Sequence, residues 1–412
     1  MKIKLSFAFF VVILVTIIYA PITYLGFANI DDEWILLNHP IVQANAPNIH
    51  FFTALFTDTQ YLMYSPINTL YYYLIYQLNG YNPYYYHLGS LFIHLLNISL
   101  IFILMKKILN VFSVENAEIV AYSIAVTWAV LPFNVQSVVW ISATKVLLFA
   151  FFGNISFICF IKAYIKASKT WYFLSIIAFV LSCLAKEQGV LYALVITLFV
   201  YLYQSKIDSK INVKKIINTA GPFILLGFFI GLFMTWVNVT GKEQHVFDYY
   251  PFHQRIFLSF YCVWIYALKT LIPISLQLRY PYPMKYGHSL PLIYYSYPFV
   301  IMFITWLSYL ILKKNKDKEV FYLGFGIFIF HLLLCIQVIQ MPRISLYADR
   351  YTYLSSGGLL LIFFLILNQK FDLSFKSTSR LQNIAFAGFI LYIILLTGYS
   401  YTLTKAWEMM QL

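Results

Sequence analysis

Charged side chains are scarce in this sequence. They make up 10% of 412 residues, while hydrophobic residues make up 61%. A soluble fold could not cover its surface with so few polar groups. A membrane β-barrel would show alternating apolarity, whereas this chain contains unbroken apolar runs of about 20 residues, the length of a transmembrane helix. We therefore predict an all-α polytopic membrane protein.

Cysteine is also rare. Cys159, Cys183, Cys262 and Cys335 all lie inside apolar runs and are widely spaced. This pattern predicts neither a disulfide framework nor a zinc site, so we interpret the four as small buried residues. Internal repeats are lacking too, and residues 1–412 are expected to form a single transmembrane domain.

Acidic residues are outnumbered, 15 against 28 Lys and Arg, for a net charge of +13. The basic residues occur in short clusters between apolar runs, which is typical of cytoplasmic loops of membrane proteins and does not indicate nucleic-acid binding. The clusters are Lys2 and Lys4; Lys106 and Lys107; Lys162, Lys166 and Lys169; Lys206, Lys210, Lys214 and Lys215; Lys313, Lys314, Lys316 and Lys318; and Lys370, Lys376 and Arg380. They place the N-terminus inside, and we interpret the first apolar run as a retained helix because no small-residue cleavage site follows it.

Each pair of neighbouring inner clusters must be connected by two helices, one outward and one back. About eleven membrane crossings satisfy this requirement. They are expected near 5–25, 86–105, 118–133, 144–162, 171–185, 188–204, 216–237, 292–312, 320–339, 355–369 and 382–403. The segment 256–273 would make twelve crossings. A full crossing there would put an odd number of helices between the inner clusters at Lys215 and Lys313, so we expect this segment to be re-entrant or to lie in the interface. The first outer loop, about residues 26–84, is long and rich in tyrosine, which indicates interfacial helices.

Another set of charged residues, separate from these clusters, falls on the outer side of this topology. They are Asp31, Asp32, Glu33, Lys145, Lys186, Glu187, Arg279, Lys285, Arg343, Asp349 and Arg350. Exposed ion pairs explain any single one of them about as well as function does. For the whole set, a polar pocket on the outer face is the better explanation.

Several short motifs in fixed order resemble one family along nearly the whole chain. They are Asn29-Ile30-Asp31-Asp32-Glu33; Tyr81-Asn82-Pro83 with Tyr86-His87-Leu88; Trp140-Ile141-Ser142 with Lys145; Ala185-Lys186-Glu187; Leu276 with Tyr280 and Pro281; and Ala348-Asp349-Arg350-Tyr351. This series resembles the transmembrane, tetratricopeptide-containing O-mannosyltransferases and their bacterial relatives, in the GT-C class of lipid-donor glycosyltransferases. The resemblance implies a GT-C-like bundle and an inverting transfer of a sugar, mannose in that family, from polyprenyl phosphate to a hydroxyl acceptor.

The chain also departs from the family's pattern. Tyr64-Ser65-Pro66 stands where the family usually has Tyr-Arg-Pro, Leu131 to Gln136 replaces a stretch bearing His and Glu, and Thr144-Lys145-Val146 replaces Arg-Lys-Asp. The sequence stops near Trp407-Glu408, where the family begins its repeats, so no soluble tetratricopeptide domain is expected.

The chemistry of such a transfer can be matched to these residue types. A carboxylate must take the acceptor's proton, and Asp31 or Asp32 is the candidate base, because neighbouring buried acids raise one another's pKa. The leaving phosphate needs fixed positive charge. The candidates are Arg350 first, then Lys186, Arg343 and Arg279. Supporting roles are expected for Glu33, Glu187, Asp349, Lys145 and His87, and for Glu187 and Asp349 the balancing of buried charge is preferred to direct chemistry.

Other interpretations stay open. Asp31 and Asp32 could hold a divalent cation, although no further acid is placed to complete its shell. A transporter would carry its site near the midplane on broken, repeat-related helices, which the sequence does not show. A non-catalytic scaffold that binds polyprenyl phosphate is a closer alternative to the enzyme.

The expected acceptor is a protein or a cell-surface glycan or lipid. The composition suits a bacterial inner membrane with the site facing the periplasm or exterior, and the endoplasmic reticulum is the eukaryotic alternative.

Overall fold

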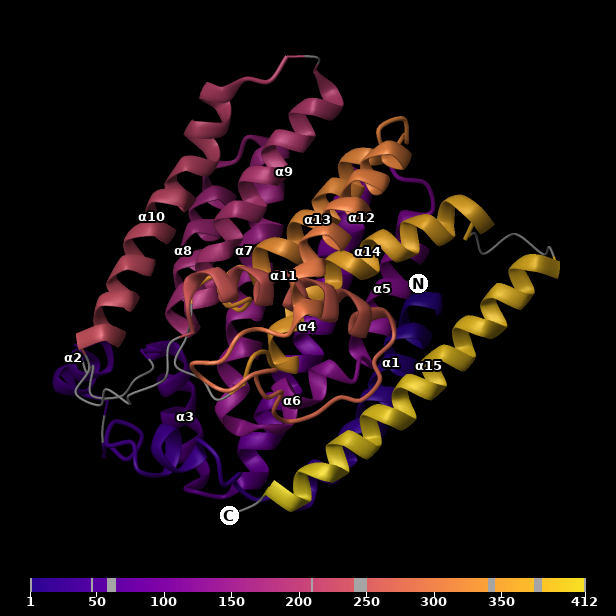
Figure 1. The fold of residues 1–412 in the computed structure, drawn as a ribbon. Helices are drawn as coiled ribbons and strands as arrows, with labels where there is room; N and C mark the ends of the chain where they lie inside the picture. Colours follow the sequence, from indigo (N-terminus) through magenta and orange to yellow (C-terminus); the bar gives the residue numbers. More distant parts are fainter. Residues whose placement is uncertain are drawn as a thin grey trace.

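The structure is a computed structural model of the chain, and it describes residues 2–45, 47–57, 64–208, 210–240, 250–339, 345–373 and 380–410. Within these ranges every regular element is helical, apart from an isolated antiparallel bridge between Tyr280 and Tyr347 (Figure 1). This confirms the prediction of an all-helical chain.

The long helices form a bundle around a few central members (Figure 1). The α-helices are α1 Lys2–Tyr19, α2 Ile49–Thr57, α3 Pro66–Asn79, α4 Pro83–Val111, α5 Ala117–Ala129, α6 Phe133–Val139, α7 Thr144–Lys166, α8 Lys169–Ala185, α9 Tyr192–Ile207, α10 Val213–Thr240, α11 Phe252–Leu271, α12 Tyr297–Leu312, α13 Lys318–Leu332, α14 Thr352–Phe371 and α15 Arg380–Ala406. Short helical turns accompany them: η1 Ala20–Tyr24, η2 Glu33–Leu37, η3 Ile141–Ala143, η4 Glu187–Leu191, η5 Leu292–Ser296, η6 Asp349–Tyr351 and η7 Trp407–Met410.

Among the described residues, seven helices are long and apolar enough to cross a membrane. They contain α4, α7, α9, α10, α12, α14 and α15, and the bent pair α5 and α6 makes an eighth if it is one span. This supports an integral membrane protein, but it does not reach the eleven crossings expected from the sequence.

A helix lies at every expected span, and three of the four spans that are not candidates contain a short or bent helix. The described apolar part of α1 with η1, Phe9–Tyr24, and α8 are shorter apolar helices, and α13 has 15 residues. The expected span 118–133 is broken by a 63° bend between α5 and α6. Pro132 lies at that bend, where its ring cannot continue a helix. The uncertain segment 256–273 is α11, which is not among the candidate spans.

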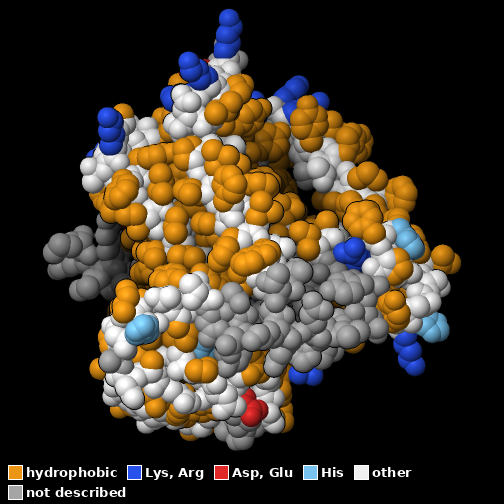
Figure 2. Space-filling view, turned by 90° about the vertical axis from the view of Figure 1, so that its left-hand side faces the viewer, with side chains coloured by type: hydrophobic (Ala, Val, Ile, Leu, Met, Phe, Trp, Pro, Cys, Tyr) orange, Lys and Arg blue, Asp and Glu red, His pale blue; other side chains and the backbone are white. Residues whose placement is uncertain are grey.

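Burial separates central from peripheral helices. In the spans that contain α7 and α14, 78% of the most apolar window is buried, whereas in those of α10 and α12 the figures are 17% and 6%. A broad band of hydrophobic side chains accordingly covers the visible face, with Lys and Arg side chains at its upper end (Figure 2). Apolar side chains that face outward in such a band fit a lipid environment.

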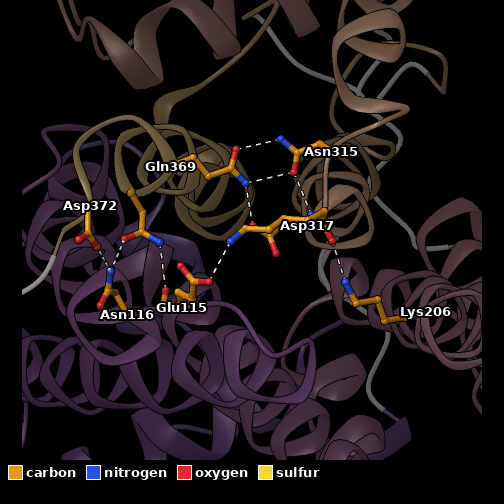
Figure 3. Close-up of polar contacts among 9 residues, drawn as sticks. Glu115, Asn116, Lys206, Asn315, Asp317, Gln369 and Asp372 are labelled. Atoms are coloured by element: carbon orange, nitrogen blue, oxygen red, sulfur yellow. Dashed lines mark hydrogen bonds and ion pairs between the residues drawn. The ribbon is translucent and has the colours of Figure 1, made fainter.

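A polar network ties helix ends together at one end of the bundle (Figure 3). Glu115 accepts from Lys316 at 3.0 Å, and Gln369 donates to Asp317 at 2.7 Å. Asn116 donates to Asp372 at 2.8 Å, and the Lys206 ammonium reaches the Lys316 carbonyl oxygen at 2.7 Å. These contacts join the α4–α5 and α12–α13 connections to the ends of α9 and α14.

The first expected loop folds against the opposite end of the bundle. It contains η2, α2 and α3, and Tyr72 of α3 donates to the Ile141 carbonyl oxygen at 2.6 Å. The C-terminal turn η7 reaches the same place, because Asn29 N donates to Met410 O at 2.8 Å and Trp140 stacks on Trp407 with ring centroids 6.1 Å apart. The C-terminal turn of the described chain thus contributes to the region where most candidate residues lie.

Candidate functional site

Asp32 is fully buried and anchors the first loop. One carboxylate oxygen accepts from Ala28 N at 2.8 Å, and the other accepts from Ser142 N at 2.9 Å and from the Ser142 hydroxyl. Burial raises the pKa of Asp32, and the hydrogen bonds from Ser142 and Ala28 oppose that rise. Both oxygens are occupied, so this acid joins the first loop to η3 and does not face solvent.

Asp31 lies beside it in a different setting. Asp31 is half-buried, and its charge acts on the Lys145 ammonium together with the charges of Lys186, Glu187 and Arg350. We call these five residues the charge cluster. They come from four separate places in the chain, and the structure brings them together.

The charge cluster is formally unbalanced. It contains three basic side chains, Lys145, Lys186 and Arg350, and two acidic ones, Asp31 and Glu187. Lys186 pairs with Glu187 at 2.9 Å, and their side chains are 7% and 30% exposed. A partly buried group with more basic than acidic side chains suits an anionic ligand such as a phosphate.

The Arg350 guanidinium is oriented by aromatic rings. It lies 4.9 Å from the centroid of the Trp140 ring and 4.8 Å from that of Tyr351, and it donates to the Tyr351 hydroxyl at 3.1 Å. Lys186 lies 5.8 Å from the same Tyr351 ring. Stacking restricts a side chain that would otherwise be flexible, so Arg350 is held ready for a planar anion.

Gln136 connects Arg350 to the loop after α11. Its side-chain oxygen accepts from the Arg350 backbone N at 3.0 Å, and its amide donates to the Leu278 carbonyl oxygen at 3.3 Å. The next residue, Arg279, is exposed. Sequence reasoning noted Gln136 only as part of a departure from the family pattern. A buried amide in an apolar stretch was the one signal that could have marked it, because such groups require partners.

The Asp349 side chain forms its hydrogen bond with Tyr280 and not with its neighbour Arg350. Its carboxylate is buried and accepts from the Tyr280 hydroxyl at 2.7 Å. Lys269 lies 4.3 Å from the Tyr280 ring, which stacks on Tyr347 at 4.0 Å. Burial raises the pKa of the Tyr280 phenol, so it stays a hydrogen-bond donor to Asp349. The Asp349 carboxylate is therefore held by a neutral phenol, and its role in balancing buried charge stays a prediction.

The other predicted residues lie outside the charge cluster. Glu33 is exposed and accepts from Asn38 at 3.5 Å, while Arg279 points into the open from its loop. His87 is buried in α4, where its Nε2 lies 3.1 Å from the Gly26 carbonyl oxygen and fixes the exit of the first helix. Arg343 lies outside the described residues.

The donor set for a metal ion is incomplete. In the described ranges, no three His, Cys, Asp or Glu side chains gather closely enough to hold one. Asp32 contributes no open carboxylate oxygen, since both accept hydrogen bonds. The acids of the first loop therefore do not fit the oxygen-rich shell that a divalent cation requires.

An apolar groove of about 640 Å³ lies between α3, α4 and α7. Its walls include Tyr71 and Ile75 of α3, Leu88 and Phe92 of α4, and Leu148 and Phe152 of α7. Gly89 allows this close packing, since a Cβ there would lie 2.3 Å from the Tyr71 hydroxyl. Lys145, Leu148 and Phe152 are spaced three and four residues apart, so they share one face of α7. The groove thus begins about one helical turn from the charge cluster.

Comparison with known proteins adds no relative: no protein-family model, curated protein or solved structure matches this chain. The functional interpretation therefore depends on the geometry described above and on the ordered motifs of the sequence.

Proposed function

We propose that this protein is an integral membrane glycosyltransferase of the GT-C class. It would transfer a sugar, mannose by resemblance, from polyprenyl phosphate to a hydroxyl acceptor with inversion at the anomeric carbon. The observation that supports this most is the juxtaposition of the charge cluster, in which basic side chains outnumber acidic ones, and an apolar groove. A polyprenyl-phosphate sugar carries an anionic group next to a long apolar chain.

Each part of the site has a role in this proposal. The polyprenyl chain lies along α3, α4 and α7, and the phosphate binds Arg350 and Lys186. Asp31 accepts the proton of the acceptor hydroxyl while the oxygen of that hydroxyl bonds to the anomeric carbon. The bond from that carbon to the phosphate oxygen breaks, and the electron pair leaves with the phosphate. Asp31 is preferred to Asp32 as the base because it is half-buried, while both Asp32 oxygens are occupied.

The proposed orientation follows the lysines. The basic end of the bundle belongs on the cytoplasmic side, which places the charge cluster on the extracytoplasmic side. A bacterial inner membrane is the proposed location, with the endoplasmic reticulum as the eukaryotic counterpart. The acceptor is a protein or a cell-surface glycan or lipid.

A second candidate is a non-catalytic scaffold that binds polyprenyl phosphate. It is favoured by Tyr64-Ser65-Pro66, which lacks the cation found in the family, and by the lack of an acidic residue in the stretch from Leu131 to Gln136. Both candidates share the lipid-binding groove and differ in turnover.

The test is sugar transfer by the purified protein from radiolabelled polyprenyl-phosphate sugars, with crude acceptor membranes present and with lipid binding measured in parallel. We expect Asp31→Asn to lower turnover by about 10²–10⁴-fold while the donor still binds, which is the usual contribution of a general base. Glu33→Gln removes a neighbouring exposed acid and serves as the matched control. Arg350→Ala is expected to weaken donor binding.

The outcomes separate the candidates. Binding without turnover across several sugars would support the scaffold. If the unmodified protein does not bind polyprenyl phosphate, both candidates fail.

A further inference from the structure

Three lysines converge at the basic end of the bundle, far along α4 and α7 from the proposed active site. The charges of Lys162 and Lys166 on α7 act on Lys107 at the end of α4. Lys162 and Lys166 are four residues apart and so lie on one face of their helix. Like charges held together destabilise a protein unless an anion compensates them.

The acids at this end are engaged elsewhere. Glu118 pairs with Lys106 at 2.8 Å, Glu115 with Lys316 at 3.0 Å and Glu319 with Lys206 at 3.8 Å. Across the part of the chain that the structure describes, no acid forms an ion pair with Lys107, Lys162 or Lys166. The three lysines are therefore able to bind an anion from outside the protein.

The surroundings of the three lysines fit the headgroup level of a membrane. The Lys162 ammonium lies 4.0 Å from the centroid of the Trp171 ring on α8. Tryptophan is enriched at the membrane–water interface. Ile165 near the end of α7 and Phe173 and Leu174 near the start of α8 are 44%, 64% and 43% exposed. Apolar side chains open to acyl chains therefore occur within one helical turn of Lys162 or Trp171.

We infer that Lys107, Lys162 and Lys166 bind the phosphate of an anionic phospholipid, whose acyl chains pack on the exposed apolar side chains of α7 and α8. Lysine contributes a compact positive charge to a phosphate, and basic pockets between transmembrane helices recognise anionic headgroups. This site is separate from the proposed donor site and does not depend on the proposed enzymatic function.

The test is native mass spectrometry of the purified full chain in detergent, titrated with dioleoyl phosphatidylglycerol, with dioleoyl phosphatidylcholine or with inorganic phosphate. The test variant carries Lys107→Gln, Lys162→Gln and Lys166→Gln. The matched control carries Lys106→Gln, Lys206→Gln and Lys316→Gln, which removes the same total charge from lysines paired with acids. A third variant with Arg at the three test positions keeps the charge and checks that the site tolerates substitution.

We expect the test variant to lose phosphatidylglycerol affinity by roughly fivefold for each lysine removed, while the control stays within about twofold. The arginine variant should retain binding, and phosphatidylcholine should bind the unmodified protein and the test variant alike. Equal losses in the test and control variants would show attraction by net charge alone and overturn the inference. Displacement of the lipid by inorganic phosphate would also overturn it, because it would identify a free-phosphate site.

Discussion

The polar network at the basic end and the charge cluster at the other end handle charge in different ways. Within the polar network, charged and amide groups pair with one another, as between Lys316 and Glu115 or Gln369 and Asp317 (Figure 3). At the other end, the charge cluster gathers three cations and two anions that act on one another at partly buried positions. Paired surface charges suffice to join loops, whereas an unbalanced, partly buried group indicates a ligand. The predictions below test this contrast.

The largest expected effect is on stability, at the buried anchor of the site. Asp32→Ala removes the acceptor of three hydrogen bonds from Ala28 and Ser142, and the stranded donors should lower the free energy of unfolding by about 3 kcal/mol. Thermal unfolding in detergent, followed by size-exclusion chromatography, measures the loss. Asp31→Ala is the neighbouring control and should change stability little. If the two alanine variants unfold alike, Asp32 is not the anchor.

A smaller effect is expected from pH. Because burial raises the pKa of Asp32 above its ordinary value of 3.8, the unfolded carboxyl ionises first as the pH rises. The free energy of unfolding should therefore fall between the two pKa values and level off above them. Asp32→Asn should remove this part of the slope in unfolding experiments from about pH 3.5 to about pH 7. A slope of the opposite sign would mean that the hydrogen bonds outweigh burial.

The smallest effect is expected in the polar network at the basic end. Lys316→Gln breaks an ion pair whose side chains are 64% and 73% exposed, and such pairs rarely contribute measurably. The apparent melting temperature should stay within the error of the measurement at low and high salt. A clear, salt-dependent loss of stability would show that this end also depends on its charges and would weaken the contrast.

The sequence predicted the helices better than the crossings. Each expected span coincides with a helix, because long apolar runs dictate helical structure in lipid. Hydropathy could not reveal the bend at Pro132 or the early ends of α8 and α13, which reduce the candidate spans to seven or eight. The length of each helix depends on tertiary packing and on local breaks in the helix.

Topology predicted one side of the bundle for Asp31, Lys145, Lys186, Glu187 and Arg350, but it predicted the same side for Glu33, Arg279 and Asp349, which lie outside the charge cluster. The individual roles of these residues could not be predicted from topology either. Asp31 and Asp32 are identical in type and adjacent in sequence, yet one accepts hydrogen bonds on both oxygens and the other belongs to the charge cluster. Gln136 was equally hidden, because its partners Arg350 and Leu278 are far away in the chain.

The contacts between η7 and the start of the chain have a consequence for biosynthesis. Trp407 stacks on Trp140, and the Met410 carbonyl oxygen accepts from Asn29 N, so one wall of the site is built from residues translated long after the rest. While the nascent chain is still on the ribosome, Asp31 and its neighbours lack this cover. This contact is thus completed only when translation has passed residue 410, and until then the charge cluster of the emerging protein lacks its final cover.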